Sequence, residues 1–265
     1  MKYCNNKKVY KDIKRPLLFA HRGVSSLAPE NTLSAFKKVV ELGIPGVELD
    51  VHLTKDGKLV VIHDESIKRT GRIFNSEKNE LQIAPDITVE ESTYEYLLQF
   101  DFGIWFNSDF AGEKLPLLSE VLDVLGPAVY VDIEIKIDTL FCRNVARKTA
   151  SVLHEYLEKY PQNPHRFMVS SFNPFAINCF SKYSNIPTAL IYENKKTSPF
   201  IIRNGRGMFF SNPVALKPCW DIVTGKENKE VFVWTVDDVE FINDLQLKNV
   251  QGFCSNKPQI LKKKL

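Results

Sequence analysis

The stretch from Gly46 to Asp64, GVELDVHLTKDGKLVVIHD, constrains the fold of this chain more than any other. Glu48 and Asp50 alternate with Val and Leu, and side chains two residues apart on a strand project from the same face. The TKDG sequence that follows is typical of a turn, and a second β-like run ends at His63. A parallel crossover needs roughly a dozen residues or more. We therefore predict a hairpin that returns His63 to about the level of Asp50.

Eight short apolar runs, separated by helix-compatible segments, predict an α/β fold of the TIM (β/α)8 barrel type. The runs cover residues 17–20, 46–51, 129–135, 166–170, 188–192, 207–211, 231–235 and 250–254. Asn31 is the predicted N-cap of a helix that ends near Gly43. Further amphipathic helices are expected over 117–125 and 143–160.

The length of 265 residues and the hydrophobic content of 44% allow a full core, and we predict one domain over residues 1–265. The net charge of +3 is too small to indicate nucleic-acid binding without a clustered basic face. The basic ends MKYCNNKKVYKDIKR and LKKKL are typical of solvated termini. No apolar run approaches the ~18 residues of a membrane span, and the start lacks a signal-peptide core. Stable membrane association is therefore not expected.

The cysteines are widely scattered, odd in number and without CxxC spacing. They are Cys4, Cys142, Cys179, Cys219 and Cys254. This pattern favours reduced thiols over a disulfide framework or a zinc site, and so predicts a cytoplasmic protein. Nothing in the sequence indicates an oligomeric state.

Residues 66–115 break the alternation of strands and helices, and the segment is too long for a bare connection. It is rich in aromatic residues: Tyr94, Tyr96, Phe100, Phe102, Trp105, Phe106 and Phe110. The segment is either a small cap over the mouth of the barrel or a structural elaboration packed against it. We favour the cap, because insertions after barrel strands lie on the catalytic face.

Glu48, Asp50 and Glu134 are candidate metal ligands from two predicted strands. In the strand VYVDIEI, Glu134 shares one face with Asp132 and Lys136, and charged side chains that point into a barrel need partners. Carboxylate oxygens suit Mg²⁺ or Ca²⁺. The alternative is that the carboxylates are only buried ion-pair partners of basic residues. We favour the metal, since neighbouring carboxylates repel unless a cation neutralises them.

Basic and aromatic residues accompany these ligands. Arg22 could bind a phosphate through a bidentate fork and Lys136 as a point charge, or both could neutralise the carboxylates, and the two roles are compatible. His21 and His63 reach one rim from distant parts of the chain, as acid/base cleavage of a phosphodiester requires. Taken alone, either could be a core histidine. Trp234 ends an apolar strand and is either a wall of the substrate site or ordinary core packing.

Seven segments carry a resemblance to a known family. They are HRG at 21–23, PENT at 29–32, ELDVHLTKDG at 48–57, HD at 63–64, IEIK at 133–136, VSSF at 169–172 and VWTVDD at 233–238. With these segments in this order, the chain resembles a glycerophosphodiester phosphodiesterase. The resemblance implies a TIM barrel with an insertion between strands and a divalent metal on Glu48, Asp50 and Glu134. It also implies catalysis by His21 and His63.

The implied reaction is hydrolysis of a small glycerophosphodiester to sn-glycerol 3-phosphate and an alcohol. Arg22 and Lys136 would hold the phosphate, His21 would act as the base and His63 as the acid. Attack by the neighbouring glycerol hydroxyl, through a cyclic phosphate, and direct attack by water are both open. The chain departs from the family pattern at Ser255-Asn256, where a Thr-Asp pair is usual, and after Asp64, where a fuller glycine-rich turn is common.

Other classes of function share parts of this pattern. A lysophospholipase D or a phosphoinositide-specific phospholipase C would use a similar barrel and site. We prefer soluble deacylated substrates, because the chain shows no amphipathic membrane helix. A non-catalytic barrel that binds phosphodiesters would have no need of paired acid/base groups.

Overall fold

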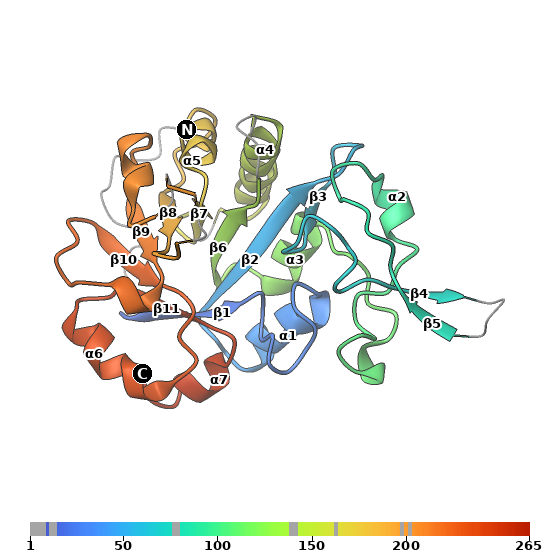
Figure 1. The fold of residues 1–265 in the computed structure, drawn as a ribbon, viewed down its shortest axis with the longest axis horizontal. Coiled ribbons are helices and arrows are strands. Elements are labelled where there is room, and N and C mark those ends of the chain that lie inside the picture. The colour runs from blue at the N-terminus through green and yellow to red at the C-terminus, as the bar shows by residue number, and fades with distance from the viewer. Residues whose placement is uncertain are drawn as a thin grey trace.

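The computed structural model describes residues 9–10, 15–75, 80–137, 143–161, 164–196, 199–200 and 203–265. Eight parallel strands close into a barrel, in the order β2-β1-β11-β10-β9-β8-β7-β6 with β6 paired to β2 (Figure 1). The strands are β1 (Leu17–His21), β2 (Gly46–Leu53), β6 (Tyr130–Ile135), β7 (Phe167–Ser171), β8 (Thr188–Tyr192), β9 (Ala215–Pro218), β10 (Glu230–Val233) and β11 (Gly252–Ser255). The predicted TIM barrel is confirmed.

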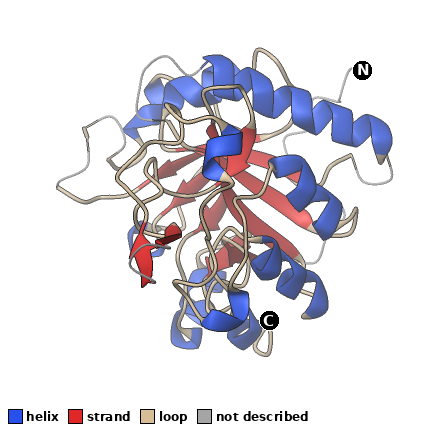
Figure 2. Ribbon diagram, turned by 90° about the vertical axis from the view of Figure 1, so that its right-hand side faces the viewer, coloured by secondary structure: helices blue, strands red, loops and turns tan. Residues whose placement is uncertain are grey.

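Helices surround the strands of the barrel (Figure 2). They are α1 (Leu33–Glu41), α3 (Leu118–Leu125), α4 (Arg143–Lys159), α5 (Pro174–Phe180), α6 (Ile242–Leu247) and α7 (Pro258–Leu261), with the 3₁₀ turns η2 (Arg206–Phe209), η3 (Trp220–Ile222) and η4 (Val239–Phe241). Their apolar faces pack on the outward side chains of the strands in a shared outer core. No helix among the described residues is both long enough and apolar enough to cross a membrane.

A second, inner core fills the end of the barrel at which the strands begin. Phe19, Met168 and Phe232 lie there beside Tyr10, whose hydroxyl donates to the Val131 carbonyl at 3.1 Å. Tyr10 is 1% exposed, so the expectation of a solvated N-terminal stretch was wrong at this residue, because the open end of the barrel offers apolar surface to cover. Residues 1–8 and 11–14 of that stretch lie outside the described residues.

Two local predictions were wrong. Residues 207–211 do not form a barrel strand: η2 covers most of them, and the strand is β9 at Ala215–Pro218. The apolar run GMFFS concealed this, while β9 carries the charged Lys217 and ends at a proline. The N-cap of α1 is Thr32 rather than Asn31, since the Thr32 hydroxyl accepts from the Ala35 amide at 3.3 Å. Asn31 has a left-handed φ of +57°, and its side chain bonds to Asp50 instead of capping the helix.

The predicted hairpin arm is confirmed. β3 (Leu59–Val61) runs antiparallel to β2, with Val51 opposite Val61. The Ile62 amide donates to the Asp50 carbonyl at 3.1 Å, so His63 arrives beside the carboxylates of β2. This return depends only on the tight turn, which is why the sequence could predict it.

The segment 66–115 contains the two-stranded sheet β4 (Arg72–Asn75) and β5 (Glu80–Ile83), the short helix α2 (Tyr94–Leu97) and the 3₁₀ turn η1 (Ser108–Phe110). The β4–β5 sheet projects away from the barrel, beyond the arm (Figure 1). Phe100, Phe102 and Leu115 form a core of their own with Val60 and Ile62 of the arm. Part of the aromatic content is therefore structural, and the role of the segment as a cap stays a prediction.

Cys179, Cys219 and Cys254 are free thiols. Cys4 and Cys142 lie outside the described residues.

Candidate active site

The three predicted metal ligands meet at the end of the barrel where β2 and β6 finish. Asp50 pairs with Glu134 in the β2–β6 register, and Glu48 lies one inward position earlier on β2. One carboxylate oxygen from each residue lies within 4.8 Å of the others. All three side chains are buried, so their charges are removed from water.

The pKa values of the two β2 carboxylates in this cluster shift in opposite directions. Burial raises the pKa of Glu48 well above its usual value, and the Asp50 carboxylate raises it further. Burial alone would also raise the pKa of Asp50, but Lys136 and then Arg22 outweigh it and hold that pKa far below its usual value. Asp50 Oδ1 is buried and accepts no hydrogen bond, although Lys136 Nζ lies 3.2 Å away as an ion pair. Three hard oxygen donors with an unsatisfied acceptor fit a divalent cation.

Arg22 and Lys136 both contact this cluster. Lys136 Nζ lies 2.7 Å from Glu134, and burial, which would lower its pKa, is outweighed by Glu134 and Asp50, which raise it. Arg22 has a left-handed φ of +58°, and its Nε lies 3.5 Å from Asp50 while Nη1 lies 2.9 Å from Glu30. Both cations therefore neutralise carboxylates, and phosphate binding remains a prediction for them.

His21 ends β1 at the same rim. Its Nδ1 lies 2.6 Å from Asn256 Oδ1, and its Nε2 lies 3.8 Å from Glu48 Oε2. Burial and the nearby Arg22 lower the pKa of His21 to about 4, against the opposing effect of the hydrogen bond with Asn256. The lowered pKa of His21 favours the neutral imidazole, and Nε2 lies on the side of the carboxylate cluster.

His63 has a different partner. Its Nδ1 lies 2.6 Å from Asp64 Oδ1, and Asp64 Oδ2 accepts from Arg69 Nε at 2.5 Å. Arg69 also donates to Glu30, the carboxylate that Arg22 contacts. Partial burial would raise the pKa of Asp64, but the hydrogen bonds from His63 and Arg69 outweigh it and hold the pKa well below its usual value. Asp64 is therefore an ionised acceptor for the His63 ring.

Sequence reasoning missed several residues of the site. Asn31 is buried and donates from Nδ2 to Asp50 Oδ2 at 2.9 Å, which orients that carboxylate. Lys217 is buried in the barrel interior with Nζ 2.6 Å from Asp132. Asn31 was predicted as a helix N-cap within PENT and not as a site residue, and Lys217 lies on the strand that the sequence did not reveal. Asn256 was noticed as a departure from the family but not as a partner of His21.

Trp234 lies just after β10, and its indole nitrogen donates to the Lys217 carbonyl at 2.9 Å. Its ring meets Phe172 edge-on at 5.4 Å between centroids, and Lys136 Nζ lies 6.0 Å from the centre of the Phe172 ring. The aromatic pair therefore lies next to one of the predicted phosphate ligands. A role as a wall of the substrate site stays a prediction.

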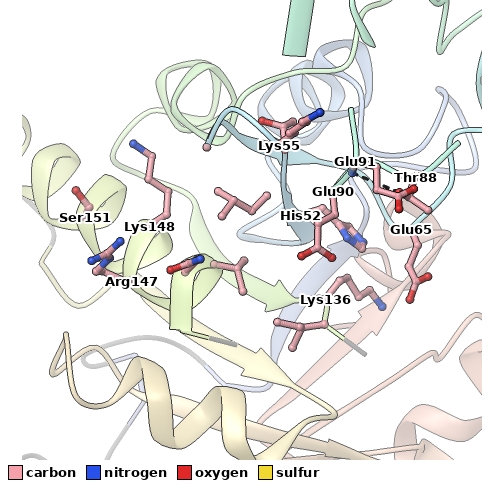
Figure 3. Close-up of a pocket in the computed structure, with 16 residues that line it drawn as sticks. His52, Lys55, Glu65, Thr88, Glu90, Glu91, Lys136, Arg147, Lys148 and Ser151 are labelled. Atoms are coloured by element: carbon pink, nitrogen blue, oxygen red, sulfur yellow. Dashed lines mark hydrogen bonds between the residues drawn. The ribbon is translucent and has the colours of Figure 1, made fainter. Parts of the chain in front are cut away.

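A hollow of about 1090 Å³ opens between the arm, the first half of α4 and the segment 66–115 (Figure 3). His52 and Lys136 line it, so it adjoins the carboxylate cluster through Lys136, while His21 and His63 do not line it. Basic side chains on the arm and α4 face acidic ones on and just before the segment 66–115: Lys55, Arg147 and Lys148 against Glu65, Glu90 and Glu91. The hollow is thus polar and carries both signs of charge.

The model of the glycerophosphoryl diester phosphodiesterase family matches residues 21–260. The chain belongs to this family. It is 34% identical to a glycerophosphodiester phosphodiesterase of Caldanaerobacter subterraneus subsp. tengcongensis, over 93% of this chain and 96% of that one. The activity that goes with family membership is hydrolysis of a glycerophosphodiester.

Solved structures share the fold. A phosphodiesterase of Oleispira antarctica, solved in complex with the product sn-glycerol-3-phosphate, matches with a TM-score of 0.75 and 23% identity over 94% of this chain and 96% of that one. A putative glycerophosphoryl diester phosphodiesterase of Silicibacter pomeroyi DSS-3 matches with a TM-score of 0.77 and 21% identity over 93% and 92%.

Proposed function

We propose that His21 and His63 catalyse this hydrolysis as base and acid, beside a divalent cation held by Glu48, Asp50 and Glu134. The observation that carries the assignment is the difference between the two imidazole partners. His21 contacts a neutral amide, whereas His63 contacts the Asp64 carboxylate. A carboxylate stabilises an imidazolium through a charge-assisted hydrogen bond, and an amide oxygen does so less. His21 is thus suited to accept a proton and His63 to donate one.

The cation would be Mg²⁺ or Ca²⁺, both of which favour carboxylate oxygens. When bound, it would supply Lewis-acid stabilisation of the negative charge on the phosphodiester. The remaining chemistry belongs to the side chains of this chain.

Arg22 and Lys136 would hold the phosphate of the substrate. Both already lie against the carboxylates of the cluster, so a cation that takes over those carboxylates leaves the guanidinium and the ammonium available to an anion. His21 Nε2 would remove the proton of the attacking hydroxyl, from either glycerol or water. His63 would protonate the departing alcohol, and both routes of attack fit this division of roles.

The alcohol of the substrate would leave on the side of His63, with Trp234 and Phe172 as a wall beside the phosphate. A small glycerophosphodiester is the proposed substrate. The mixed charges of the hollow beside Lys136 are compatible with a polar head group. A cytoplasmic location, predicted from the spacing of the cysteines, belongs to the same proposal, as does the absence of nucleic-acid and stable membrane partners.

The roles are tested by comparing a natural diester with the p-nitrophenyl ester of glycerol 3-phosphate. Loss of either histidine should lower turnover of the natural diester by roughly 10²- to 10⁴-fold. Because p-nitrophenolate needs little protonation on leaving, His63→Ala should be partly rescued on this ester and His21→Ala should not.

The matched control is His154→Ala. His154 lies on α4, and its Nε2 forms a hydrogen bond with the Ser184 hydroxyl. This variant should leave both rates unchanged. Equal rescue of the two mutants would remove the basis for separate roles. Rescue of His21→Ala alone would reverse them.

A further inference from the structure

The partner of His21 is itself held by a second residue. Asn256 Nδ2 donates to Asp237 Oδ2 at 2.8 Å, and the Asn256 backbone amide donates to Asp237 Oδ1 at 2.8 Å. The Ser255 hydroxyl also donates to Asp237 Oδ1, at 3.0 Å. An ionised carboxylate accepts hydrogen bonds and donates none. Three donors therefore converge on Asp237.

This arrangement settles which way the Asn256 amide faces. An asparagine side chain has a donor end and an acceptor end, and only its NH₂ group can bond to a carboxylate. The Asn256 oxygen must consequently face the other way, where it lies 2.6 Å from His21 Nδ1 and 3.3 Å from the Ser25 hydroxyl. The orientation follows from the chemistry of Asp237.

The orientation of the amide in turn decides where the proton of His21 resides. A neutral imidazole carries one proton, on either Nδ1 or Nε2. Since the Asn256 oxygen can only accept, the proton must lie on Nδ1. Nε2 is then free of a proton, and it is the nitrogen that lies 3.8 Å from Glu48 Oε2 in the metal cluster.

We propose that Asp237 and Asn256 are positioning residues for His21. Asp237 orients the Asn256 amide, and the Asn256 oxygen keeps the proton of His21 on Nδ1, so that Nε2 faces the reacting atoms as an unprotonated base. The proposal rests on the proposed function in one respect, namely that His21 is the base. It assigns roles to two residues on the loop after β10 and at the end of β11 that contact no metal ligand in the described contacts.

The decisive substitution is Asp237→Asn. The remaining oxygen can still accept from Ser255 and the Asn256 backbone, but the new NH₂ group would face the NH₂ group of Asn256. The Asn256 amide should then turn over and present its NH₂ group to His21 Nδ1, which moves the proton to Nε2. We expect kcat to fall by roughly 10²- to 10⁴-fold with little change in KM, because no group that holds the substrate has changed.

The double variant Asp237→Asn with Asn256→Asp exchanges the amide and the carboxylate. The carboxylate introduced at position 256 can accept both from the NH₂ group introduced at position 237 and from His21 Nδ1, so the proton should return to Nδ1. We expect kcat to recover at least about tenfold over Asp237→Asn alone, a coupling that separate structural damage would not produce, but to stay below that of the unmodified enzyme, because the introduced carboxylate also stabilises a protonated His21. Asp238→Asn is the matched control, since this neighbouring carboxylate is exposed and makes no side-chain cap bond, and it should behave as the unmodified enzyme.

The tautomer of His21 is read directly by ¹⁵N NMR of histidine-labelled protein at about pH 8, where an imidazole is neutral, with His21→Ala to assign the signals. A proton on Nδ1 in the unmodified protein and the double variant, and on Nε2 in Asp237→Asn, would support the proposal. A proton that stays on Nδ1 in Asp237→Asn, or a double variant no more active than Asp237→Asn alone, would overturn it.

If Asp237→Asn does not fold, Asn256→Ala gives the same test. It removes the oxygen, so a single Nδ1 tautomer and unchanged kcat would overturn the proposal, whereas mixed tautomers and a lowered kcat would support it. Failure of the proposed function is distinguishable: an active His21→Ala would reject His21 as the base and leave the tautomer measurement intact.

Discussion

At the scale of single residues, Lys217 shows how the barrel interior tolerates its carboxylates. It is 3% exposed, with Nζ 2.6 Å from Asp132 and 3.3 Å from the Ser170 hydroxyl. Burial would lower its pKa, but Asp132 and then Glu48 outweigh burial and raise it. A buried cation therefore lies beside the carboxylate cluster and offsets part of its negative charge.

Lys217→Met should lower the free energy of unfolding by about 3–5 kcal/mol, because it leaves Asp132 buried without its cation. Chemical denaturation at neutral pH measures the change. The matched double variant Lys217→Met with Asp132→Leu removes both charges and should recover most of the loss. A single variant as stable as the unmodified protein would show that Asp132 needs no partner.

At the scale of elements, the arm connects the barrel to the segment 66–115. The outward side chains of Val60 and Ile62 pack into the small core of that segment with Phe100 and Leu115, while the inward side of β2 carries the carboxylates Glu48 and Asp50. The hairpin of β2 and β3 therefore both supplies carboxylates of the site and packs against the segment 66–115. Displacement of the segment would be expected to move His63, which follows the returning strand directly.

Trp105 is the aromatic residue of this segment with which to separate a cap from a structural elaboration. It is only partly buried, and its indole nitrogen donates to the Phe102 carbonyl at 2.9 Å. Trp105→Ala should change the ranking among head groups more than it changes stability, measured with a set of glycerophosphodiesters and by thermal unfolding.

The contrasting variant is Phe100→Ala, which alters a side chain that is 1% exposed and should cost about 3–5 kcal/mol of stability. If Trp105→Ala instead shifts unfolding strongly and leaves the ranking untouched, the segment is structural.

At the scale of the whole molecule, the barrel is divided along its axis into an apolar end and a charged end. Tyr10 and the inner core close the end where the strands begin, and the carboxylates occupy the other end. Carboxylates at such short separation oppose folding unless a cation neutralises them. Metal binding should therefore contribute both to activity and to the stability of the whole barrel.

Chelation should abolish activity, and Mg²⁺ or Ca²⁺ should restore it. At a free-ion concentration about 100-fold above Kd, the ion should stabilise the fold by about 2.7 kcal/mol, visible as a rise in Tm. Glu134→Gln should lose most of this rise, and Glu41→Gln, which alters an exposed carboxylate on α1, should keep it. Full activity in excess chelator, from protein shown to be metal-free, would contradict the prediction.

Local patterns were enough to predict the barrel, the arm and the proximity of Glu48, Asp50 and His63. Alternation places Glu48 and Asp50 on one face, and a tight turn returns His63, both within about 20 residues of chain. The same reasoning failed for β9, because the apolar run at 207–211, with Met208, Phe209 and Phe210 exposed, resembles a strand more than Ala215–Pro218 does. Periodicity alone does not distinguish an exposed apolar run from a buried one.

Only the tertiary structure decided which groups surround the predicted residues. Asn256 meets His21 across 235 positions of sequence, because closing the barrel places β11 beside β1. Asn31 turns from the start of α1 to Asp50, and Lys217 reaches Asp132 across the barrel interior. Sequence by itself determined which side chains can accept, donate or coordinate. Their partners, and hence their protonation and orientation, depend on distances set by closure of the ring, which no local pattern contains.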